Sequence, residues 1–183
     1  MTPPPEIERV LFTEEQVSQR IGEVASEISE KFRGRDLKLI GVLKGSVFFL
    51  TALARAIVIP VKIDFLAISS FGSGAPGMVR IAKDLDDPIE DEDILLVEDI
   101  VDTGFTTRYL LQTLAGRGPR SLGICTLLDR TVRRIVQVPV AFRCFEIPDR
   151  FVVGCGLDYK QLYRNLGYIA VMNPEGLGTN KKC

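Results

Sequence analysis

Three carboxylates crowd into five positions of the stretch LLVEDIVDTGFTT, residues 95–107, directly after an apolar run. Like charges at this spacing repel one another unless a cation or hydrogen-bond donors hold them in place. Glu98, Asp99 and Asp102 could accept hydrogen bonds from sugar hydroxyls or hold a divalent cation through their oxygen atoms. The crowding indicates a binding site, with a solvated acidic turn before a capped helix as the alternative.

A glycine and three threonines follow the acids within DTGFTT. Gly104 lets the backbone turn its N–H groups inward, and Thr103, Thr106 and Thr107 add hydroxyl donors. Amides at the start of a helix form an anion site that suits a phosphate group. The stretch thus offers hydrogen-bond acceptors for sugar hydroxyls, followed directly by hydrogen-bond donors for a phosphate. This order matches a phosphorylated sugar. The stretch is neither a Walker loop nor a dinucleotide-binding fingerprint, because GxxxxGK[ST] and GxGxxG are both absent there.

Apolar runs and helical stripes alternate around this stretch and must position it. TEEQ, Thr13–Gln16, has the form of a capping box and opens a helical stripe that stops near Gly34. Further helices are predicted at 47–58 and at 106–118, the latter with Thr106 or Thr107 near its cap and Gly116 at its end. Strands are predicted at 37–43, 61–69, 78–85, 94–97, 121–128, 140–147, 151–155 and 168–172.

This alternation predicts an α/β protein with a mainly parallel, twisted sheet flanked by helices on both faces. Ligands of such sheets bind beyond the carboxyl ends of the strands, so Glu98 and Asp99 should project into a crevice after strand 94–97. SFGSGAPG, residues 70–77, holds three glycines and a proline and predicts a flexible loop. The Pro-rich residues 1–12 are expected to be loosely held.

The composition of the chain favours some classes of protein and excludes others. The chain has 183 residues, 46% of them hydrophobic and 26% charged, which predicts one ordinary globular domain over residues 1–183. A net charge of −1 gives no support for nucleic-acid or membrane partners. No histidine is present, which excludes Ser-His or Cys-His catalysis within one chain. Cys125, Cys144 and Cys155 are interpreted as buried thiols of a cytoplasmic protein.

VEDIVDTGFTT resembles the 5-phosphoribosyl 1-diphosphate (PRPP) binding motif of type I phosphoribosyltransferases. The chain is similar in particular to their hypoxanthine-guanine branch, over roughly residues 7–172. Four further stretches carry this resemblance in the expected order: GVLKGSVFF (41–49), SSFG (69–72), FEIPDRFVVGCGLDY (145–159) and YRNLGYI (163–169).

The resemblance implies the type I phosphoribosyltransferase fold, with a core at about residues 37–150 and a small hood formed by the terminal segments. It implies transfer of ribose 5-phosphate from PRPP to N9 of a 6-oxopurine (hypoxanthine, guanine or xanthine), with release of pyrophosphate and with Mg²⁺ as cofactor. The family is commonly dimeric or tetrameric, so a homodimer or homotetramer is expected.

The resemblance also implies roles for residues of the acidic stretch. Glu98 and Asp99 would face the ribose hydroxyls and a magnesium ion, and Asp102 would exchange a proton with N7 of the purine. The 5-phosphate cradle would consist of five consecutive residues: Thr103, Gly104, Phe105, Thr106 and Thr107.

Other motif positions complete the implied site. Lys44 and Gly45 would bind pyrophosphate, with the Leu43–Lys44 peptide in the cis form, and Arg164 would bind it too. The purine would stack on Phe151 and meet the backbone of Val152. Asp158 would hold magnesium and also contribute to the purine site, and Ser70 and Phe71 would belong to a mobile loop that closes over the reacting centre.

Two positions depart from the family pattern. Arg130 stands where a lysine usually hydrogen-bonds O6 of the purine, and arginine is larger and forked, so the base preference is open. Phe71 stands where the loop usually has a tyrosine, and the loop is slightly shorter than usual, so its closure is open too.

Three other functions remain as alternatives. A regulatory relative that binds RNA would need a basic surface, which the net charge of −1 does not favour. A phosphoribosyltransferase for adenine or a pyrimidine would share the PRPP motif. A nucleotide-binding protein without turnover would bind PRPP and release no pyrophosphate.

Overall fold

The computed structural model describes residue 4 and residues 6–70 and 79–173. Its larger sheet has six strands in the order β4-β3-β2-β5-β6-β7, and all neighbours are parallel except β3 and β4. The mainly parallel sheet expected from the sequence is therefore confirmed. The strands are β2 (Leu37–Leu43), β3 (Val61–Ser70), β4 (Val79–Lys83), β5 (Asp93–Val101), β6 (Ser121–Asp129) and β7 (Val140–Glu146).

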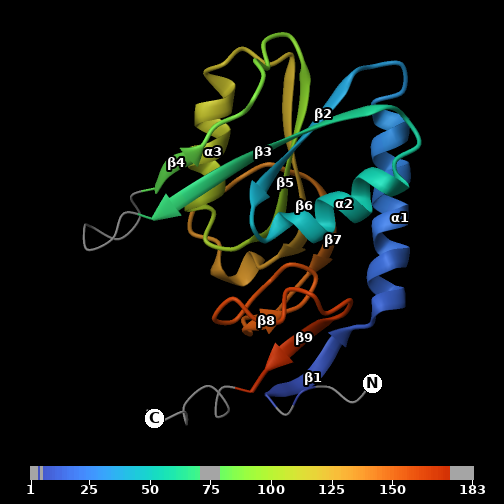
Figure 1. The fold of residues 1–183 in the computed structure, drawn as a ribbon, viewed down its shortest axis with the longest axis vertical. Coiled ribbons are helices and arrows are strands. Elements are labelled where there is room, and N and C mark those ends of the chain that lie inside the picture. The colour runs from blue at the N-terminus through green and yellow to red at the C-terminus, as the bar shows by residue number, and fades with distance from the viewer. Residues whose placement is uncertain (1–3, 5, 71–78, 174–183) are drawn as a thin grey trace.

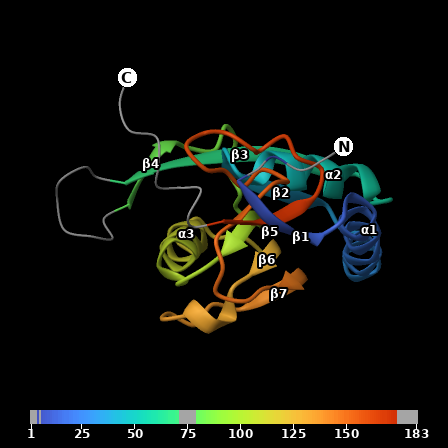
Figure 2. The ribbon, with the colours of Figure 1, turned by 90° about the horizontal axis from the view of Figure 1, so that it is seen from below.

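Three α-helices cover the two faces of this sheet. Helices α1 (Glu14–Lys31) and α2 (Ser46–Ala56) pack on one face, and α3 (Phe105–Ala115) packs on the other (Figure 2). The capping box is confirmed at the start of α1. The hydroxyl of Thr13 accepts from the Gln16 amide at 3.3 Å, and the Gln16 side chain accepts from the Thr13 amide at 2.9 Å.

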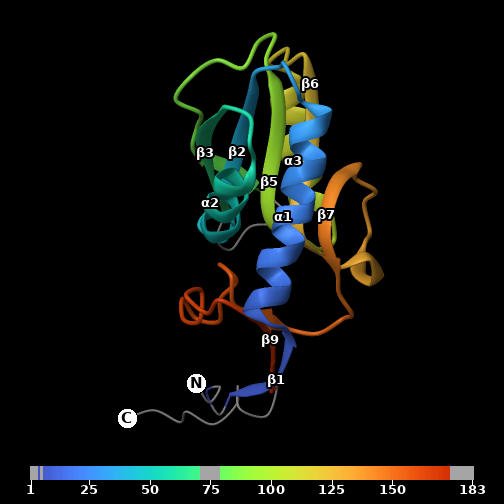
Figure 3. The same cartoon turned by 90° about the vertical axis from the view of Figure 1, so that its right-hand side faces the viewer.

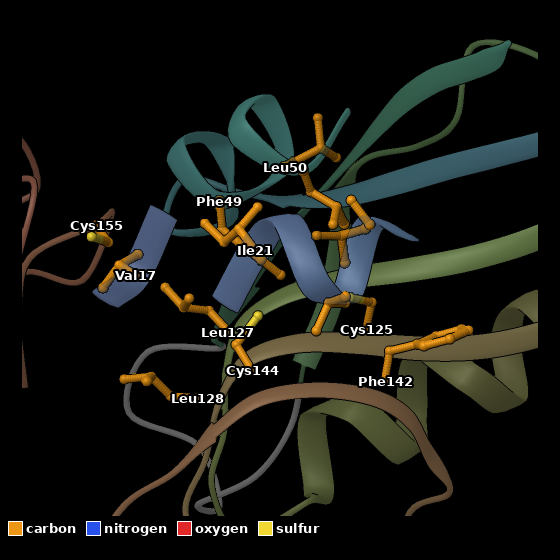
Figure 4. Packing of buried hydrophobic residues seen from close by; sticks show 14 of the residues in the cluster. Val17, Ile21, Phe49, Leu50, Cys125, Leu127, Leu128, Phe142, Cys144 and Cys155 are labelled. Atoms are coloured by element: carbon orange, nitrogen blue, oxygen red, sulfur yellow. The ribbon is translucent and has the colours of Figure 1, made fainter. Parts of the chain in front are cut away.

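The larger hydrophobic cluster fills the space between α1, α2 and the sheet. Figure 4 shows Ile21 of α1 and Phe49 of α2 side by side, between the two helices and the side chains of Leu127 and Cys125 of β6. Leu50 of α2 packs against Gly41 of β2. A smaller cluster lies under α3. Burial of each of these apolar side chains contributes about 1.5–3 kcal/mol to the stability of the fold. This packing therefore holds the helices in place against the strands.

A second sheet forms a hood beyond the carboxyl ends of the parallel strands (Figures 1 and 3). It consists of β1 (Ile7–Phe12), β9 (Ile169–Met172) and β8 (Val152–Val153), all antiparallel. The hood expected from the terminal segments is present. The expectation that residues 1–12 are loosely held is wrong for residues 7–12, because they pair with β9.

Several boundaries differ from those predicted. Strand β5 runs to Val101 instead of ending at residue 97, because its pairing with β6 continues to Asp129. The N-cap of α3 is Gly104, with φ +90°, instead of Thr106 or Thr107, and β8 has only two residues. A short 3₁₀ helix, η1 (Thr131–Arg133), follows β6. Among the described residues, no helix is long and apolar enough to cross a membrane.

Candidate functional site

The paired acids lie where β5 loses one of its two neighbours. Strand β2 pairs with β5 only as far as Val97, whereas β6 stays paired beyond it. Glu98 and Asp99 follow at this opening between β2 and β5, inside the longer strand instead of after its end. Glu98 is buried, and Asp99 is partly buried.

Burial raises the pKa of both acids. It raises the pKa of Glu98 well above the ordinary value of a glutamate, and the neighbouring charge of Asp99 adds to this. Burial also raises the pKa of Asp99, although the Ile100 amide donates to its carboxylate at 2.9 Å and lowers the pKa in part. The free protein thus holds two crowded acids that a bound cationic group would stabilise.

Three turns interlock beside Asp99. A Cβ atom at Gly45 would lie 1.6 Å from the Asp99 carboxylate, and one at Gly156 would lie 1.9 Å from the carbonyl of Gly45. The expected cis peptide between Leu43 and Lys44 is present at the start of this arrangement. The turn after β2, the end of β5 and the hood therefore meet with no room for a side chain.

A cavity of about 250 Å³ opens beside these turns. The predicted phosphate loop, which we define as residues 102–107, contributes most of its polar lining: Asp102, Thr103, Gly104, Thr106 and Thr107, together with Glu98 and Asp99. Phe105 is not among the lining residues, and its side chain is 53% exposed. The first amides of α3 have no acceptor inside the helix, so they can donate to an anion in this cavity.

A second cavity, of about 340 Å³, adjoins the first and shares Asp99, Ile100 and Asp102 with it. Phe151 lines it with a half-exposed ring that packs edge-on against Tyr159 at 5.9 Å between centroids. Such a ring can stack on a flat heterocycle. The remaining lining residues are Arg130, Arg133, Val152, Leu157 and Asp158.

Arg130 connects two walls of this second cavity. Its Nη2 donates to the carbonyl of Arg150 at 2.7 Å, and its Nη1 lies 3.5 Å from Oδ2 of Asp102. Two of the three buried side-chain atoms that lack a hydrogen-bond partner in the described part of the chain belong to residues that line this cavity, namely Nε of Arg130 and Oδ1 of Asp102, the latter 3.8 Å from Nε of Arg133. One is a donor and the other an acceptor, so a ligand with both kinds of group could satisfy them.

Asp158 and Arg164 lie together, although the sequence suggested different ligands for them. Arg164 Nη2 lies 2.6 Å from the Asp158 carboxylate, and its Nη1 donates to the carbonyl of Gly156 at 2.6 Å. The Gln161 amide donates to the other Asp158 oxygen at 2.8 Å. If Arg164 bound an anion and Asp158 bound a cation, the ion pair between them would break, and each side chain would pair with its ligand instead.

The predicted metal ligands do not form a ready-made site. Among the described residues, no three of the usual ligand types are placed to hold one ion, so Glu98, Asp99 and Asp158 do not converge. Of the predicted closing loop, the backbone of Ser70 pairs with Val79 at the end of β3. Phe71 lies outside the described residues.

The sequence reasoning missed the residues that follow β6. Arg133 lines the second cavity, with its Nε 3.8 Å from Asp102, and Arg134 is a buried side chain that donates to the carbonyl of Asp102 at 2.9 Å. The signal was the run RTVRR, residues 130–134, at the end of a predicted strand. Basic residues at that place face the acids that end β5.

Two named relatives are similar to this chain in sequence. A hypoxanthine-guanine phosphoribosyltransferase of Mycobacterium avium is 49% identical over 179 residues, 93% of this chain and 88% of the relative. A hypoxanthine phosphoribosyltransferase of Escherichia coli is 46% identical over 164 residues, 87% of this chain and 92% of the relative.

A solved structure agrees with the sequence comparisons. A hypoxanthine phosphoribosyltransferase variant of Trypanosoma cruzi, in a ternary complex with its substrates, superposes with a TM-score of 0.90 and 40% identity. The match covers 94% of this chain and 98% of that one. The family model described as "Phosphoribosyl transferase domain" matches residues 11–160. The chain therefore belongs to the phosphoribosyltransferase domain family.

Proposed function

We propose that this chain transfers the 5-phosphoribosyl group of PRPP to N9 of a 6-oxopurine, giving IMP or GMP and pyrophosphate. The observation that carries the proposal is the pair of adjoining cavities that share Asp99, Ile100 and Asp102. One is lined by phosphate donors and the other by an aromatic ring and a cation. A phosphorylated sugar and a purine bound side by side in them would meet at the shared acids.

The phosphate loop would hold the 5-phosphate of PRPP. Thr103, Thr106 and Thr107 line the first cavity, and the unpaired amides at the start of α3 lie at the same place. Fixed donors of this kind position the sugar relative to the purine, which lowers the entropic part of the barrier.

Glu98 and Asp99 would stabilise the sugar as pyrophosphate leaves. The anomeric carbon then carries positive charge, and carboxylates in a site with little water stabilise such charge most strongly. Burial raises the pKa of both carboxyl groups, so a cationic group bound beside them would favour their charged forms. Lys44, Gly45 and Arg164 would hold the departing pyrophosphate.

The purine would lie on Phe151 in the second cavity, against the backbone of Val152. Asp102 would exchange the proton at N7 as the bond at N9 forms, which is general acid–base catalysis. Arg130 would donate to O6 of the base. Oδ1 of Asp102 and Nε of Arg130, an acceptor and a donor without hydrogen-bond partners among the described residues, support this assignment.

Mg²⁺ is the cofactor that the donor set fits. Glu98, Asp99 and Asp158 offer carboxylate oxygens, the ligands that magnesium prefers. No three ligands of the described residues converge on one ion, so fewer than three of these carboxylates would hold it at one time. The ion would neutralise charge on the pyrophosphate oxygens.

We further propose one domain over residues 1–183, a homodimer or homotetramer, and a location in the cytoplasm. The free, buried thiols of Cys125, Cys144 and Cys155 support a reducing compartment. Sedimentation of the purified chain would measure the assembly.

Pyrophosphate release tests the proposed reaction. The purified chain is incubated with PRPP, Mg²⁺ and, in turn, hypoxanthine, guanine, xanthine or adenine. We expect turnover with 6-oxopurines and none with adenine, which lacks the oxygen that Arg130 would bind. Binding of PRPP without turnover of any base would show that the chain is a binding protein instead.

A further inference from the structure

The segment after β6, residues 130–136, holds the carbonyl groups of the loop that follows β5. Nε of Arg134 donates to the carbonyl of Asp102 at 2.9 Å, and Nη2 of Arg134 donates to that of Val101 at 3.2 Å. The amides of Ile135 and Val136 both donate to the carbonyl of Thr103, at 3.0 and 2.9 Å. Three consecutive carbonyls are thus directed toward this segment.

The direction of the carbonyls fixes the direction of the amides. In a planar trans peptide the C=O and N–H groups point in opposite directions. The N–H groups of Thr103 and Gly104, which share peptides with the carbonyls of Asp102 and Thr103, therefore point away from segment 130–136. Thr103 and Gly104 line the first cavity.

Arg134 is itself held in one place. Its side chain is 8% exposed and forms an ion pair with Asp129, whose side chain is 5% exposed. The other carboxylate oxygen of Asp129 accepts from Arg143 at 3.1 Å. A Cβ atom at Gly104 would lie 3.1 Å from Cδ of Arg134, so the loop and the arginine are in close contact. A buried, multiply bonded guanidinium of this kind is rigid.

We infer that Arg134 is a positioning residue for the phosphate loop. It turns the loop carbonyls toward itself and so directs the opposite amides at the 5-phosphate of the substrate. The inference rests on the proposed function, because it takes the loop to be the 5-phosphate site. Loss of the guanidinium should weaken the recognition of that phosphate more than the recognition of the rest of the nucleotide.

The test compares IMP with inosine, which lacks the 5-phosphate. Binding of each to the full chain is measured by calorimetry for wild type, Arg134→Met and Arg35→Met. Arg35→Met is a matched control, because Arg35, which lies between α1 and β2, pairs with Asp93 at the start of β5. It too removes an arginine from a buried carboxylate, Asp93, and it too leaves that carboxylate one arginine, Arg120 at 3.3 Å.

We expect Arg134→Met to reduce the ratio of IMP affinity to inosine affinity by about tenfold or more, the effect of one lost hydrogen bond to a charged group. Arg35→Met should lower the melting temperature and leave the ratio unchanged. Arg134→Lys keeps a cation beside Asp129 and should give a smaller loss, which provides the comparison if the methionine variant does not fold.

The experiment distinguishes an error in the proposed phosphate site from an error in the role of Arg134. If wild type binds IMP no better than inosine, the phosphate site of the proposed function is wrong. If wild type discriminates and both Arg134 variants keep the full ratio, or lose affinity for both ligands equally, Arg134 does not position the loop.

Discussion

Glu98 and Asp99 show at the scale of single residues why the acidic stretch is placed where it is. Burial disfavours the charged form of each carboxyl group, and a neighbouring charge adds to this, that of Asp99 at Glu98 and that of Asp158 at Asp99. A cationic sugar and a metal ion would both relieve this repulsion. The two acids are therefore already placed where they would stabilise the positive charge of the proposed transition state.

Asp102→Asn tests the proton transfer. The amide keeps the shape of the side chain and cannot exchange a proton with N7, so we expect kcat to fall by about 100-fold or more. Affinity for PRPP should change little, because the phosphate loop stays intact. Steady-state kinetics and calorimetry measure the two effects, and Asp86→Asn, an exposed aspartate elsewhere, is the control. Undiminished turnover at equal PRPP affinity would exclude the role.

Arg130→Lys tests whether Arg130 contacts the purine and sets the preference among bases. Arg130 reaches the carbonyl of Arg150 and the carboxylate of Asp102 together, and the single amino group of lysine cannot reproduce this forked contact. We expect the ratio of kcat/KM among hypoxanthine, guanine and xanthine to change severalfold. An unchanged ratio would mean that Arg130 does not contact the base.

The buried thiols give an expected dependence of stability on pH. Burial raises the pKa of Cys144 from 9.0 to about 12 and that of Cys155 to about 11. The folded chain thus holds these protons more tightly than the unfolded chain. Their contribution to stability is complete below pH 9 and is lost as the pH rises toward 11 or 12.

Melting temperatures across this alkaline range measure the effect for wild type and for the Cys144→Ala, Cys155→Ala double variant. The variant should be less stable at neutral pH, because it loses packing, and its melting temperature should decline less steeply above pH 9. Parallel curves for the two proteins would show that the thiols do not contribute.

At the scale of elements, the site depends on turns that meet without side chains between them. Gly45 follows β2, Asp99 lies near the end of β5, and Gly156 belongs to the hood, yet all three are in contact. The strands bring these turns together because their carboxyl ends lie at one edge of the sheet. The turn after β2 that holds Lys44 and Gly45 is therefore positioned by the segment after β8 as well as by the core.

Gly156→Ala tests this interlock. The added methyl group would lie 1.9 Å from the carbonyl of Gly45, at a φ of +102° that alanine rarely adopts. We expect a loss of stability of about 1–3 kcal/mol and a larger KM for PRPP. Gly22→Ala in α1 is the control, because its Cβ would meet nothing within 4 Å and should stabilise the helix by about 0.5–1 kcal/mol. Wild-type values of stability and KM in Gly156→Ala would contradict the interlock.

The elements themselves were predictable from sequence, but the contacts between them were not. Apolar periodicity reports which residues are buried, so β2 was predicted at its exact bounds and α1 from its capping box. Where β5 ends depends on its pairing with β6, a partner that the local sequence does not reveal. The position of Arg134 beside Asp102 depends on a contact across 32 residues.

At the scale of the whole molecule, the site lies between two sheets. The six-stranded sheet supplies the acids and the phosphate loop, and the segment of the chain around the hood supplies Phe151, Asp158 and Arg164. Helix α1 joins the first hood strand to the core (Figure 1). Purine and PRPP would thus be held by different parts of one structure, and the shared acids lie where these parts meet.

A structure with Mg²⁺, PRPP and an unreactive 6-oxopurine analogue, in which carbon replaces N9, would test this central claim most directly. We expect the 5-phosphate on Thr103–Thr107, the base on Phe151, and the pyrophosphate beside Lys44 and Arg164. A base or a 5-phosphate bound outside the two cavities that share Asp99 and Asp102 would contradict the account.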